Sequence, residues 1–263
     1  MLTKLATVTL VAVLSLSPPL DQDQAQEIAA LRRQVQELRD QQAQMQQELT
    51  AIKNFLQALM KQAQGQGAAQ EPDVPGLIGA TVPTAGEPVL GSRSARITIM
   101  EVSDYQCPFC RKQALETLPR IDAEYIKTGK VQYMFVDYPI AQLHPTAARA
   151  HEAANCAAEQ GKYWEFHRGL FSGPAAKDDA SLLTVAKSAG LDAARLQSCL
   201  ASGKFTGPVQ ASVQRMEGLG IQGTPMMLIG LTPAPGEPMK VVKFVYGAQP
   251  FAAFKATLDS LLQ

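Results

Sequence analysis

The chain has 263 residues, enough for one or two domains, and 46% of them are hydrophobic, which suffices for an ordinary globular core. Lys and Arg together number 24, and Asp and Glu also number 24. This balance gives no electrostatic basis for binding nucleic acid or an anionic membrane surface, so neither is expected as a partner.

The first 25 residues have the pattern of an export signal. Lys4 supplies a positive start, and residues 5–16 form an uncharged, mostly apolar run of 12 residues. That run is short for a transmembrane helix, so it predicts a signal peptide, with Ala25 as one candidate cleavage site. An uncleaved membrane anchor is the alternative. Four cysteines, an even number, fit export to an oxidising compartment.

Residues 26–62 carry a regular heptad pattern that predicts a coiled coil. Nine of the ten inward positions are apolar, and Gln42 is the exception. The ten positions are Ile28, Leu31, Val35, Leu38, Gln42, Met45, Leu49, Ile52, Leu56 and Leu59. One helix about 55 Å long cannot bury such a stripe alone, so we expect a homo-oligomer in which Gln42 forms a polar layer. The mixture of Ile, Val and Leu at the inward positions does not clearly distinguish a dimer from a trimer, and we favour a trimer. A Gln-rich solvated arm is the alternative.

Residues 63–88 have the composition of a flexible linker. Gly, Pro and Gln dominate this stretch, and no periodicity is visible. We therefore place one folded domain at 89–263.

Strand and helix patterns alternate along this domain. Runs rich in β-branched and aromatic residues predict strands at 96–102 and 131–137, with a helix at 108–128 that joins them as parallel neighbours. The remaining expected elements are helices at about 145–160, 162–171, 179–189, 192–201 and 205–219, strands at 226–229 and 241–246, and a helix at 251–262. The pattern predicts an α/β fold with a helical insertion at about 145–219.

Cys107 and Cys110 lie where the first strand runs into its helix, in the segment EVSDYQCPFC. Unpaired N–H groups and the dipole at a helix start favour an anion, so the pKa of Cys107 should fall and a thiolate should form at neutral pH. Cys110 follows one helical turn later, close enough to form a disulfide with Cys107. Pro108 is tolerated in the first turn because its missing N–H would have no helical partner.

A zinc site and a purely structural disulfide are the alternative interpretations of this pair. Zinc would need a second ligand pair, but Cys156 and Cys199 are 43 positions apart and no histidine stands at ligand spacing. We therefore expect no metal and no cofactor. A disulfide across two intervening residues would close too small a loop to stabilise the fold much.

Three segments resemble one protein family. EVSDYQCPFC resembles the active-site segment of the DsbA-like branch of the thioredoxin superfamily, AANCAAEQGKYWEFHRGLF its inserted helical subdomain, and GIQGTPMMLIG its cis-proline loop. The N-terminal extension is similar to that of the oligomeric ScsC-type isomerases. The resemblance implies a thioredoxin fold with a helical insertion and a periplasmic thiol-disulfide oxidoreductase.

The resemblance also implies roles for individual residues. Cys107 would be the nucleophile that forms a mixed disulfide with the substrate, and Cys110 would resolve it. Glu101 would be a buried acid that moves the proton of the resolving thiol, with a raised pKa; an exposed strand carboxylate is the alternative. Pro225 would be cis, and Thr224 would present backbone groups to the substrate; an ordinary trans turn is the alternative.

Other residues carry further expectations. Pro108 and Phe109 would border the substrate and tune the redox potential, and Phe109 cannot donate a hydrogen bond to the thiolate. By resemblance, Cys156 and Cys199 would form a structural disulfide, stabilising the fold by about 4 kcal/mol in the chain-entropy model; two free cysteines or a second redox pair are the alternatives.

The histidines and aromatic residues of the insertion have plainer interpretations. His144 and His151, seven positions apart, suggest a solvated helix face more than a metal or proton-relay face. Trp164, with Tyr163 and Phe166, is expected in the helical core.

The function expected from the sequence is disulfide exchange on exported proteins that contain cysteines, supported by a membrane thiol-disulfide electron-transfer partner. The predicted oligomer favours a disulfide isomerase or reductase. A monomeric-type dithiol oxidase is one alternative. A copper-binding or chaperone protein that uses the same two cysteines as soft ligands is another.

Overall fold

The structure is a computed structural model that describes residues 22–65 and 74–263, without the side-chain surroundings of 22–25 and 55–65. Most of the expected signal peptide, residues 1–21, lies outside this description. The chain divides into two units, Met1–Gln70 and Glu71–Gln263. Nowhere in the described residues is a helix both long and apolar enough to span a membrane.

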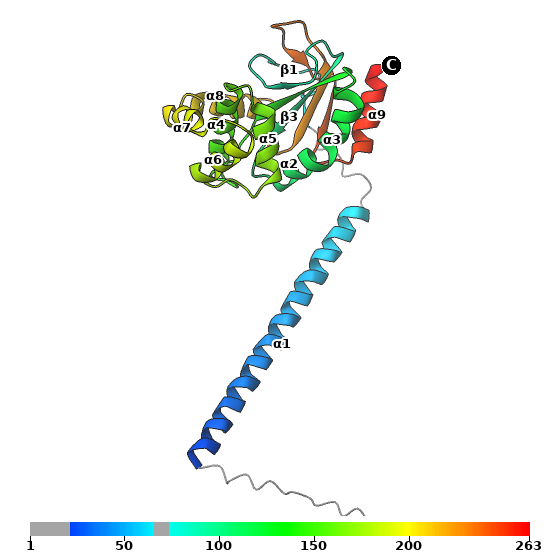
Figure 1. The fold of residues 1–263 in the computed structure, drawn as a ribbon. Helices are drawn as coiled ribbons and strands as arrows, with labels where there is room; N and C mark the ends of the chain where they lie inside the picture. The colour runs from blue at the N-terminus through cyan, green and yellow to red at the C-terminus, as the bar shows by residue number, and fades with distance from the viewer. Residues whose placement is uncertain (1–21, 66–73) are drawn as a thin grey trace, which may run out of the picture. The chain divides into compact units, whose positions relative to one another are not determined.

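The first unit contains one long helix, α1, which spans Gln22–Gly65 (Figure 1). It is 44 residues long, which corresponds to about 66 Å. Six apolar side chains of the heptad stripe are 47–63% exposed in the single chain: Leu31, Val35, Leu38, Met45, Leu49 and Ile52. The helix covers the range 26–62 in which a coiled coil is predicted.

The second unit is built on a five-stranded mixed sheet with the strand order β2-β4-β3-β5-β7. The central strands β3 (Ile97–Ser103) and β4 (Val131–Asp137) are parallel, with Ile97 opposite Val131. The other pairings are antiparallel, and they involve β2 (Val89–Leu90), β5 (Met226–Leu231) and β7 (Lys243–Tyr246). This arrangement confirms the predicted β-α-β unit and the thioredoxin fold.

The connection between β3 and β4 is helical from residue 108 to 126, close to the predicted 108–128. Its successive segments are α2 (Pro108–Lys112), the π-helical η1 (Gln113–Thr117), α3 (Leu118–Ile121) and the π-helical η2 (Asp122–Ile126). Pro119 lies in the first turn of α3 and cannot donate a helical hydrogen bond, which is consistent with the altered winding before it.

The predicted helical insertion is also confirmed. It consists of α4 (Ala147–Ala158), α5 (Tyr163–Ser172), α6 (Asp179–Ser188), α7 (Ala193–Ser202) and α8 (Thr206–Glu217). The Asp178 carboxylate accepts a hydrogen bond from the Ser181 N–H and caps α6, and Gly203 ends α7 with a left-handed φ of 66°. The last helix is α9 (Phe251–Leu262), as predicted.

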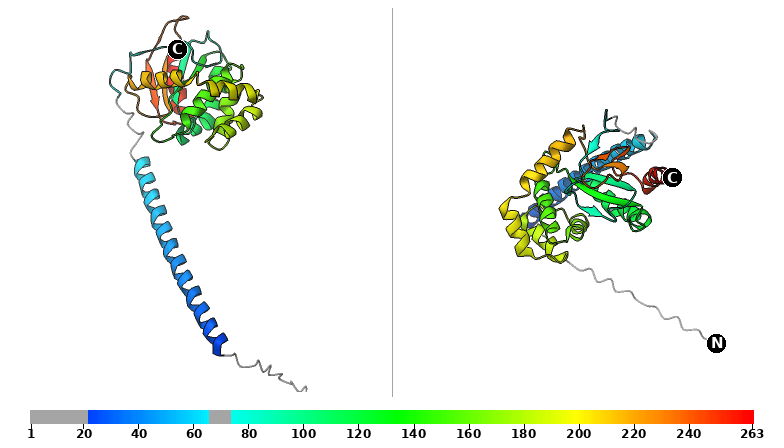
Figure 2. Two further views of the ribbon diagram at one scale, coloured as in Figure 1. Left: turned by 90° about the vertical axis from the view of Figure 1, so that its left-hand side faces the viewer. Right: turned by 90° about the horizontal axis from the view of Figure 1, so that it is seen from above.

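The two faces of the sheet are covered differently (Figure 2). Ile97 and Ile99 of β3 face a cluster with Phe254 of α9, whereas Met100 and Val102 face a cluster with Met216 of α8. In the right-hand view of Figure 2, α8 and α9 lie on opposite sides of the sheet. Strand alternation thus supplies a core on both faces, and all seven residues of β3 are buried.

The prediction of a linker up to residue 88 is wrong for the part that the structure describes. Leu77 and Val82 are 1% and 0% exposed, and β1 (Thr81–Val82) pairs with β6 (Met239–Lys240). Glu87 forms an ion pair with Arg215 of α8 at 2.7 Å. Isolated apolar residues between Gly and Pro give no periodic signal, so the sequence does not reveal that this segment is folded.

Candidate active site

Cys107 lies between β3 and α2. It is the N-cap residue of α2 with an extended backbone (φ −72°, ψ 124°), and its carbonyl accepts the first helical hydrogen bond from the Arg111 N–H at 3.0 Å. Cys107 is 6% exposed and Cys110 is 0% exposed, and both are free thiols. Pro108 occupies the first turn of α2. Cys107 and Cys110 therefore lie at a helix start, as predicted from the sequence.

The two thiols have opposite acidities. The pKa of Cys107 is lowered from 9.0 to about 5. The largest cause is the hydrogen bond from the Cys110 thiol, and smaller contributions come from Thr224 and from the N–H groups of Cys110 and Phe109. Burial raises the pKa of Cys110 well above its ordinary value, as do its hydrogen bond with Cys107 and the charge of Glu101. At neutral pH, Cys107 is therefore a thiolate beside a protonated Cys110, which is the asymmetry that disulfide exchange requires.

The loop that contains Thr224 and Pro225 lies beside this thiolate. The Thr224–Pro225 peptide bond is cis, and the Thr224 carbonyl oxygen is 3.6 Å from the Cys107 sulfur. A Cβ atom on Gly223 would lie 2.9 Å from the Tyr246 hydroxyl, so glycine allows the loop to approach β7. The loop therefore places backbone groups next to the reacting sulfur.

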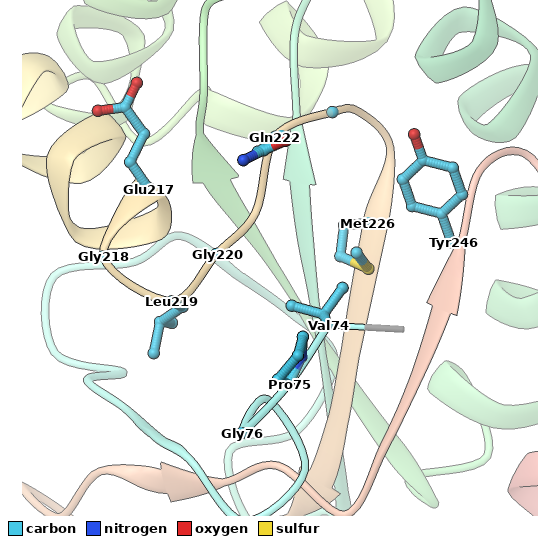
Figure 3. Close-up of a pocket in the computed structure, with 11 residues that line it drawn as sticks. Val74, Pro75, Gly76, Glu217, Gly218, Leu219, Gly220, Gln222, Met226 and Tyr246 are labelled. Atoms are coloured by element: carbon cyan, nitrogen blue, oxygen red, sulfur yellow. The ribbon is translucent and has the colours of Figure 1, made fainter. Parts of the chain in front are cut away.

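Two hollows border the site, one lined by residues that flank Thr224 and Pro225 and one lined by the start of α2. One of about 650 Å³ is lined by Gly223, Met226 and Tyr246 on one side and by Val74–Gly76 and the end of α8 on the other (Figure 3). The second, of about 420 Å³, is lined by Cys107, Pro108 and Arg111 together with residues 172–175. Phe109 is 62% exposed at the helix start. The second hollow thus gives an extended chain space next to Cys107 on the side of the helical insertion.

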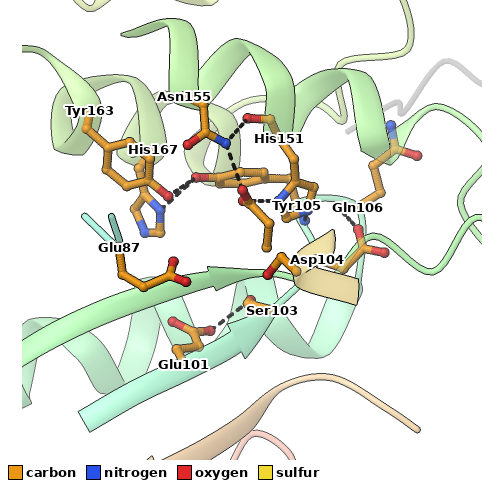
Figure 4. A network of polar contacts seen from close by, with 12 residues as sticks. Glu87, Glu101, Ser103, Asp104, Tyr105, Gln106, His151, Asn155, Tyr163 and His167 are labelled. Atoms are coloured by element: carbon orange, nitrogen blue, oxygen red, sulfur yellow. Dashed lines mark hydrogen bonds and ion pairs between the residues drawn. The ribbon is translucent and has the colours of Figure 1, made fainter. Parts of the chain in front are cut away.

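Glu101 is completely buried on β3. Its Oε1 accepts a hydrogen bond from the Ser103 hydroxyl at 2.9 Å (Figure 4). Its Oε2 accepts one from the Tyr133 hydroxyl at 2.5 Å. Burial raises the pKa of Glu101 to about 7 in spite of these two hydrogen bonds. The carboxyl group can therefore both accept and release a proton at neutral pH.

The solvated face predicted for His144 and His151 is wrong. His144 precedes α4 and lies 2.8 Å from the Asp104 carboxylate, while His151 is 0% exposed and lies 2.6 Å from Asp137. The His151 Nε2 accepts a hydrogen bond from the Tyr105 N–H at 3.4 Å. These contacts hold the segment that leads into Cys107, and the sequence offered no signal that paired the histidines with these aspartates.

Asp104 is a further residue that the sequence did not single out. Its carboxylate is fully buried and accepts hydrogen bonds from the N–H groups of Gln106 and Ile140, at 2.7 and 2.8 Å. The turn just before Cys107 is thus fixed from two directions, which keeps the reacting sulfur in place.

A buried aromatic group packs behind this turn. The Tyr105 hydroxyl lies 3.1 Å from both the Tyr163 hydroxyl and the His167 Nδ1. Burial lowers the pKa of His167 to about 3, so its ring is neutral. Phe166 is completely buried in the core, as expected, whereas Trp164 is half-buried against it and donates its N–H to the Val89 carbonyl.

The remaining cysteines are separate from the site. Cys156 of α4 and Cys199 of α7 form a disulfide with a Cα–Cα distance of 5.9 Å. It joins two helices of the insertion rather than contributing to the reacting pair. Among the described residues, no three His, Cys, Asp or Glu side chains are grouped so as to hold a metal ion.

Known proteins are similar to this chain over the same domain. A family model described as Thioredoxin matches residues 83–234, more than half of the chain. The Na(+)/H(+) antiporter NhaA 3 of Salinispora tropica is 32% identical over 141 residues, which are 54% of this chain and 21% of that protein. This chain therefore spans about a fifth of the antiporter's length, and the likeness concerns one domain.

Two further relatives match most of their own length. The probable disulfide bond formation protein D of Bacillus anthracis is 27% identical over 53% of this chain and 68% of its own. The crystal structure of oxidised BdbD from Bacillus subtilis superposes with a TM-score of 0.60 at 23% identity, covering 71% of this chain and 98% of that one. The chain belongs to the Thioredoxin family, and its fold is that of the DsbA-like thiol-disulfide oxidoreductases.

Proposed function

We propose that this chain is an exported, periplasmic thiol-disulfide oxidoreductase that acts on protein disulfides through Cys107 and Cys110. The Cys107 thiolate attacks a substrate disulfide, and the mixed disulfide is resolved by Cys110. The observation that carries this proposal is the position of Cys107 at the start of α2 beside the buried Cys110, which gives the two thiols opposite acidities. Glu101 serves the proton transfer of the resolving thiol.

The proposed substrates are exported proteins with cysteines in extended or misfolded segments. The hollow lined by Cys107 and Pro108 supports an extended polypeptide at the reacting sulfur, and the backbone of the Thr224–Pro225 loop lies beside the same sulfur. The exposed ring of Phe109 offers an apolar contact to unfolded protein. A membrane thiol-disulfide partner would return the pair to its working redox state.

We propose further that α1 assembles copies of the chain, with a trimer favoured, and that the assembly acts as a disulfide isomerase or reductase. The support is the apolar stripe, six of whose described side chains are 47–63% exposed in a single chain. Several copies of Cys107 in one assembly would hold a misfolded substrate at one site while another site attacks. This raises the effective concentration without any new contact.

A dithiol oxidase is the second candidate, and the acidity of Cys107 favours it. A thiolate stabilised by the Cys110 hydrogen bond favours the reduced protein, and the disulfide form is then the stronger oxidant. A single domain suffices for that reaction. A copper-binding or chaperone role of the same two thiols remains an outcome of the test below.

The test compares assembly with activity in the full chain. Leu38→Glu with Leu49→Glu places two charges on the apolar stripe, and Ala43→Glu with Gln47→Glu places two on the opposite side of the helix as a matched control. We expect the first variant to be monomeric by light scattering, to keep dithiol oxidation and to lose repair of scrambled substrate. The control should remain assembled and active.

The outcomes separate the candidates. A wild-type chain that is monomeric contradicts the assembly, and a monomeric variant that repairs scrambled substrate at the full rate leaves the oxidase. Absence of exchange in wild type, together with tight binding of Cu(I) by the reduced protein, would replace the enzyme by a copper-binding protein.

A further inference from the structure

The hollow of about 420 Å³ beside Cys107 has two walls that come from distant parts of the sequence. One wall is the segment around the reacting pair, within residues 105–111. The other is the end of α5 and the loop that follows it, within residues 170–175. The shape and the charge of the hollow therefore depend on the contacts that join these two segments.

Gln106 joins the walls on one side of the reacting pair. It precedes Cys107, and its side-chain Nε2 donates to the Ala176 carbonyl at 2.7 Å. Its backbone N–H is held in turn by the Asp104 carboxylate, also at 2.7 Å. Ala176 is buried in the core of the helical insertion. The far end of the loop is thus anchored both to the core and to the turn that precedes Cys107.

Arg111 joins the walls on the other side. It follows Cys107 by four positions, so the two residues lie on one face of the helix, about 6 Å apart along its axis. Its guanidinium donates to the carbonyls of Gly173 at 2.5 Å and Ser172 at 3.2 Å. These carbonyls lie at the C-terminal end of α5, where a cation is favoured. The guanidinium is therefore held in a fixed place at the hollow.

The charge of Arg111 has no carboxylate partner among the residues that the structure describes. A guanidinium has five N–H groups, and the two carbonyls take two of them. Both carbonyls are neutral, so the positive charge remains. Among the described residues that line the hollow, none is acidic and Arg111 is the one basic residue. The hollow therefore offers a cation with free donors close to the reacting sulfur.

We infer that the hollow binds an acidic side chain that lies one or two residues from the cysteine of a substrate polypeptide, and that Arg111 binds its carboxylate. An extended chain rises about 3.3 Å per residue, so a side chain at that separation spans the distance from Cys107 to Arg111. A guanidinium matches a carboxylate through parallel hydrogen bonds. The inference rests on the proposed function and names its class of substrate, which is exported proteins whose cysteines stand beside Asp or Glu.

The charge of Cys107 determines the steps at which Arg111 matters. A carboxylate that approaches the Cys107 thiolate is repelled by it, and Arg111 offsets this repulsion. Attack by Cys107 forms a bond to the sulfur of the substrate cysteine and breaks the bond between that sulfur and its former partner, which leaves as a thiolate. The negative charge has then left Cys107, so the attraction to Arg111 holds the mixed disulfide until Cys110 resolves it.

The test uses peptides whose cysteine is bonded to an aromatic thiol that is coloured when released. Attack by Cys107 of the reduced full chain on the peptide sulfur releases this thiolate, and its absorbance gives the second-order rate constant. In one series of peptides the residue before the cysteine is Glu, Gln or Lys, and in a second series the residue after it is varied in the same way. Because the hollow lies on one side of Cys107, the Glu peptide should react at least about threefold faster than the Gln peptide in one series only.

Arg111→Met should remove this preference, whereas Arg111→Lys, which keeps the charge, should keep part of it. Comparing the Glu and Gln peptides within each variant cancels a change in the shape of the hollow, because both peptides meet the same protein. Lys112→Met is the matched control. It removes the charge of a neighbouring exposed residue that does not line the hollow, so the preference should be unchanged.

Raising the salt concentration from about 0.05 to about 1 M should weaken the preference in wild type, which keeps the test available if Arg111→Met does not fold. An equal preference for the Glu peptide in wild type and in Arg111→Met, or one of the same size in both series, would overturn the acidic subsite. If wild type releases no coloured thiol, or if the release survives Cys107→Ser, the proposed function fails instead. The two failures are therefore distinct.

Discussion

Replacing Cys110 by Ala should raise the pKa of Cys107, because the hydrogen bond from the Cys110 thiol is the largest cause of its lowering. A hydrogen bond to a charged group contributes about 1.5–3 kcal/mol. At about 1.4 kcal/mol per pH unit, its loss should raise the Cys107 pKa by roughly one to two units. The contacts with Thr224 and the helix-start N–H groups remain, so the value should still lie below 9.0.

The same shift makes the stability of the reduced protein depend on pH. The pKa of Cys107 is lowered in the folded state, so its contribution is fully present above the unfolded value of 9.0 and is lost as the pH falls through about 5. The full contribution is about 5 kcal/mol, and roughly half of it, about 2.7 kcal/mol, is present at pH 7. In Cys110→Ala the contribution at pH 7 should fall to about 1 kcal/mol.

The assay is the ultraviolet absorbance of the thiolate, titrated in reduced wild type and in Cys110→Ala, with unfolding by denaturant at pH 7 and pH 5. Cys107→Ala serves as the control and should show a thiol that titrates above 9.0. An unchanged Cys107 pKa in Cys110→Ala would refute the dominant role of the neighbouring thiol and leave the helix start as the cause. A wild-type Cys107 pKa near 9.0 would remove the basis for its assignment as nucleophile.

Two predictions concern the rest of the domain. Removing the Cys156–Cys199 disulfide by serine at both positions should lower the free energy of unfolding by about 4 kcal/mol in the chain-entropy model, measured by denaturant titration without reductant; an unchanged midpoint would contradict it. Leu77→Ala should lower the free energy of unfolding by about 2–5 kcal/mol, because Leu77 is 1% exposed. Ile78→Ala is the control, since Ile78 is 59% exposed, and should change that free energy by less than about 0.5 kcal/mol. Equal effects of the two substitutions would mean that the segment is not part of the core.

The central part of the fold could be predicted because its signals are local. A β-branched run ending in Cys-Pro-Phe-Cys marks both the strand and the helix start, and the expected bounds of β4 and α9 agree with the structure. Glu101 could be placed because strand alternation puts it with Ile97 and Ile99, although the sequence could not show which groups would donate to its carboxylate.

The features that escaped prediction depend on partners distant in the sequence. His151 meets Asp137 across the β4–α4 connection, and a spacing of seven along the chain carries no information about that contact. Tyr133 points at Glu101 from the neighbouring strand, which only the register of β3 and β4 reveals. The folded segment before residue 88 was missed for the same reason.

That early segment has a consequence for the order in which the chain folds. The Thr84 hydroxyl donates to the carbonyl of Glu237, 153 positions away, next to the pairing of β1 with β6. Contacts with such wide sequence separation form slowly, since closing a long loop costs entropy before the contact is made. During synthesis, β1 cannot pair with β6, nor Thr84 reach Glu237, until the last quarter of the sequence has been made. The first strand of the domain to be made should therefore be among the last to pair.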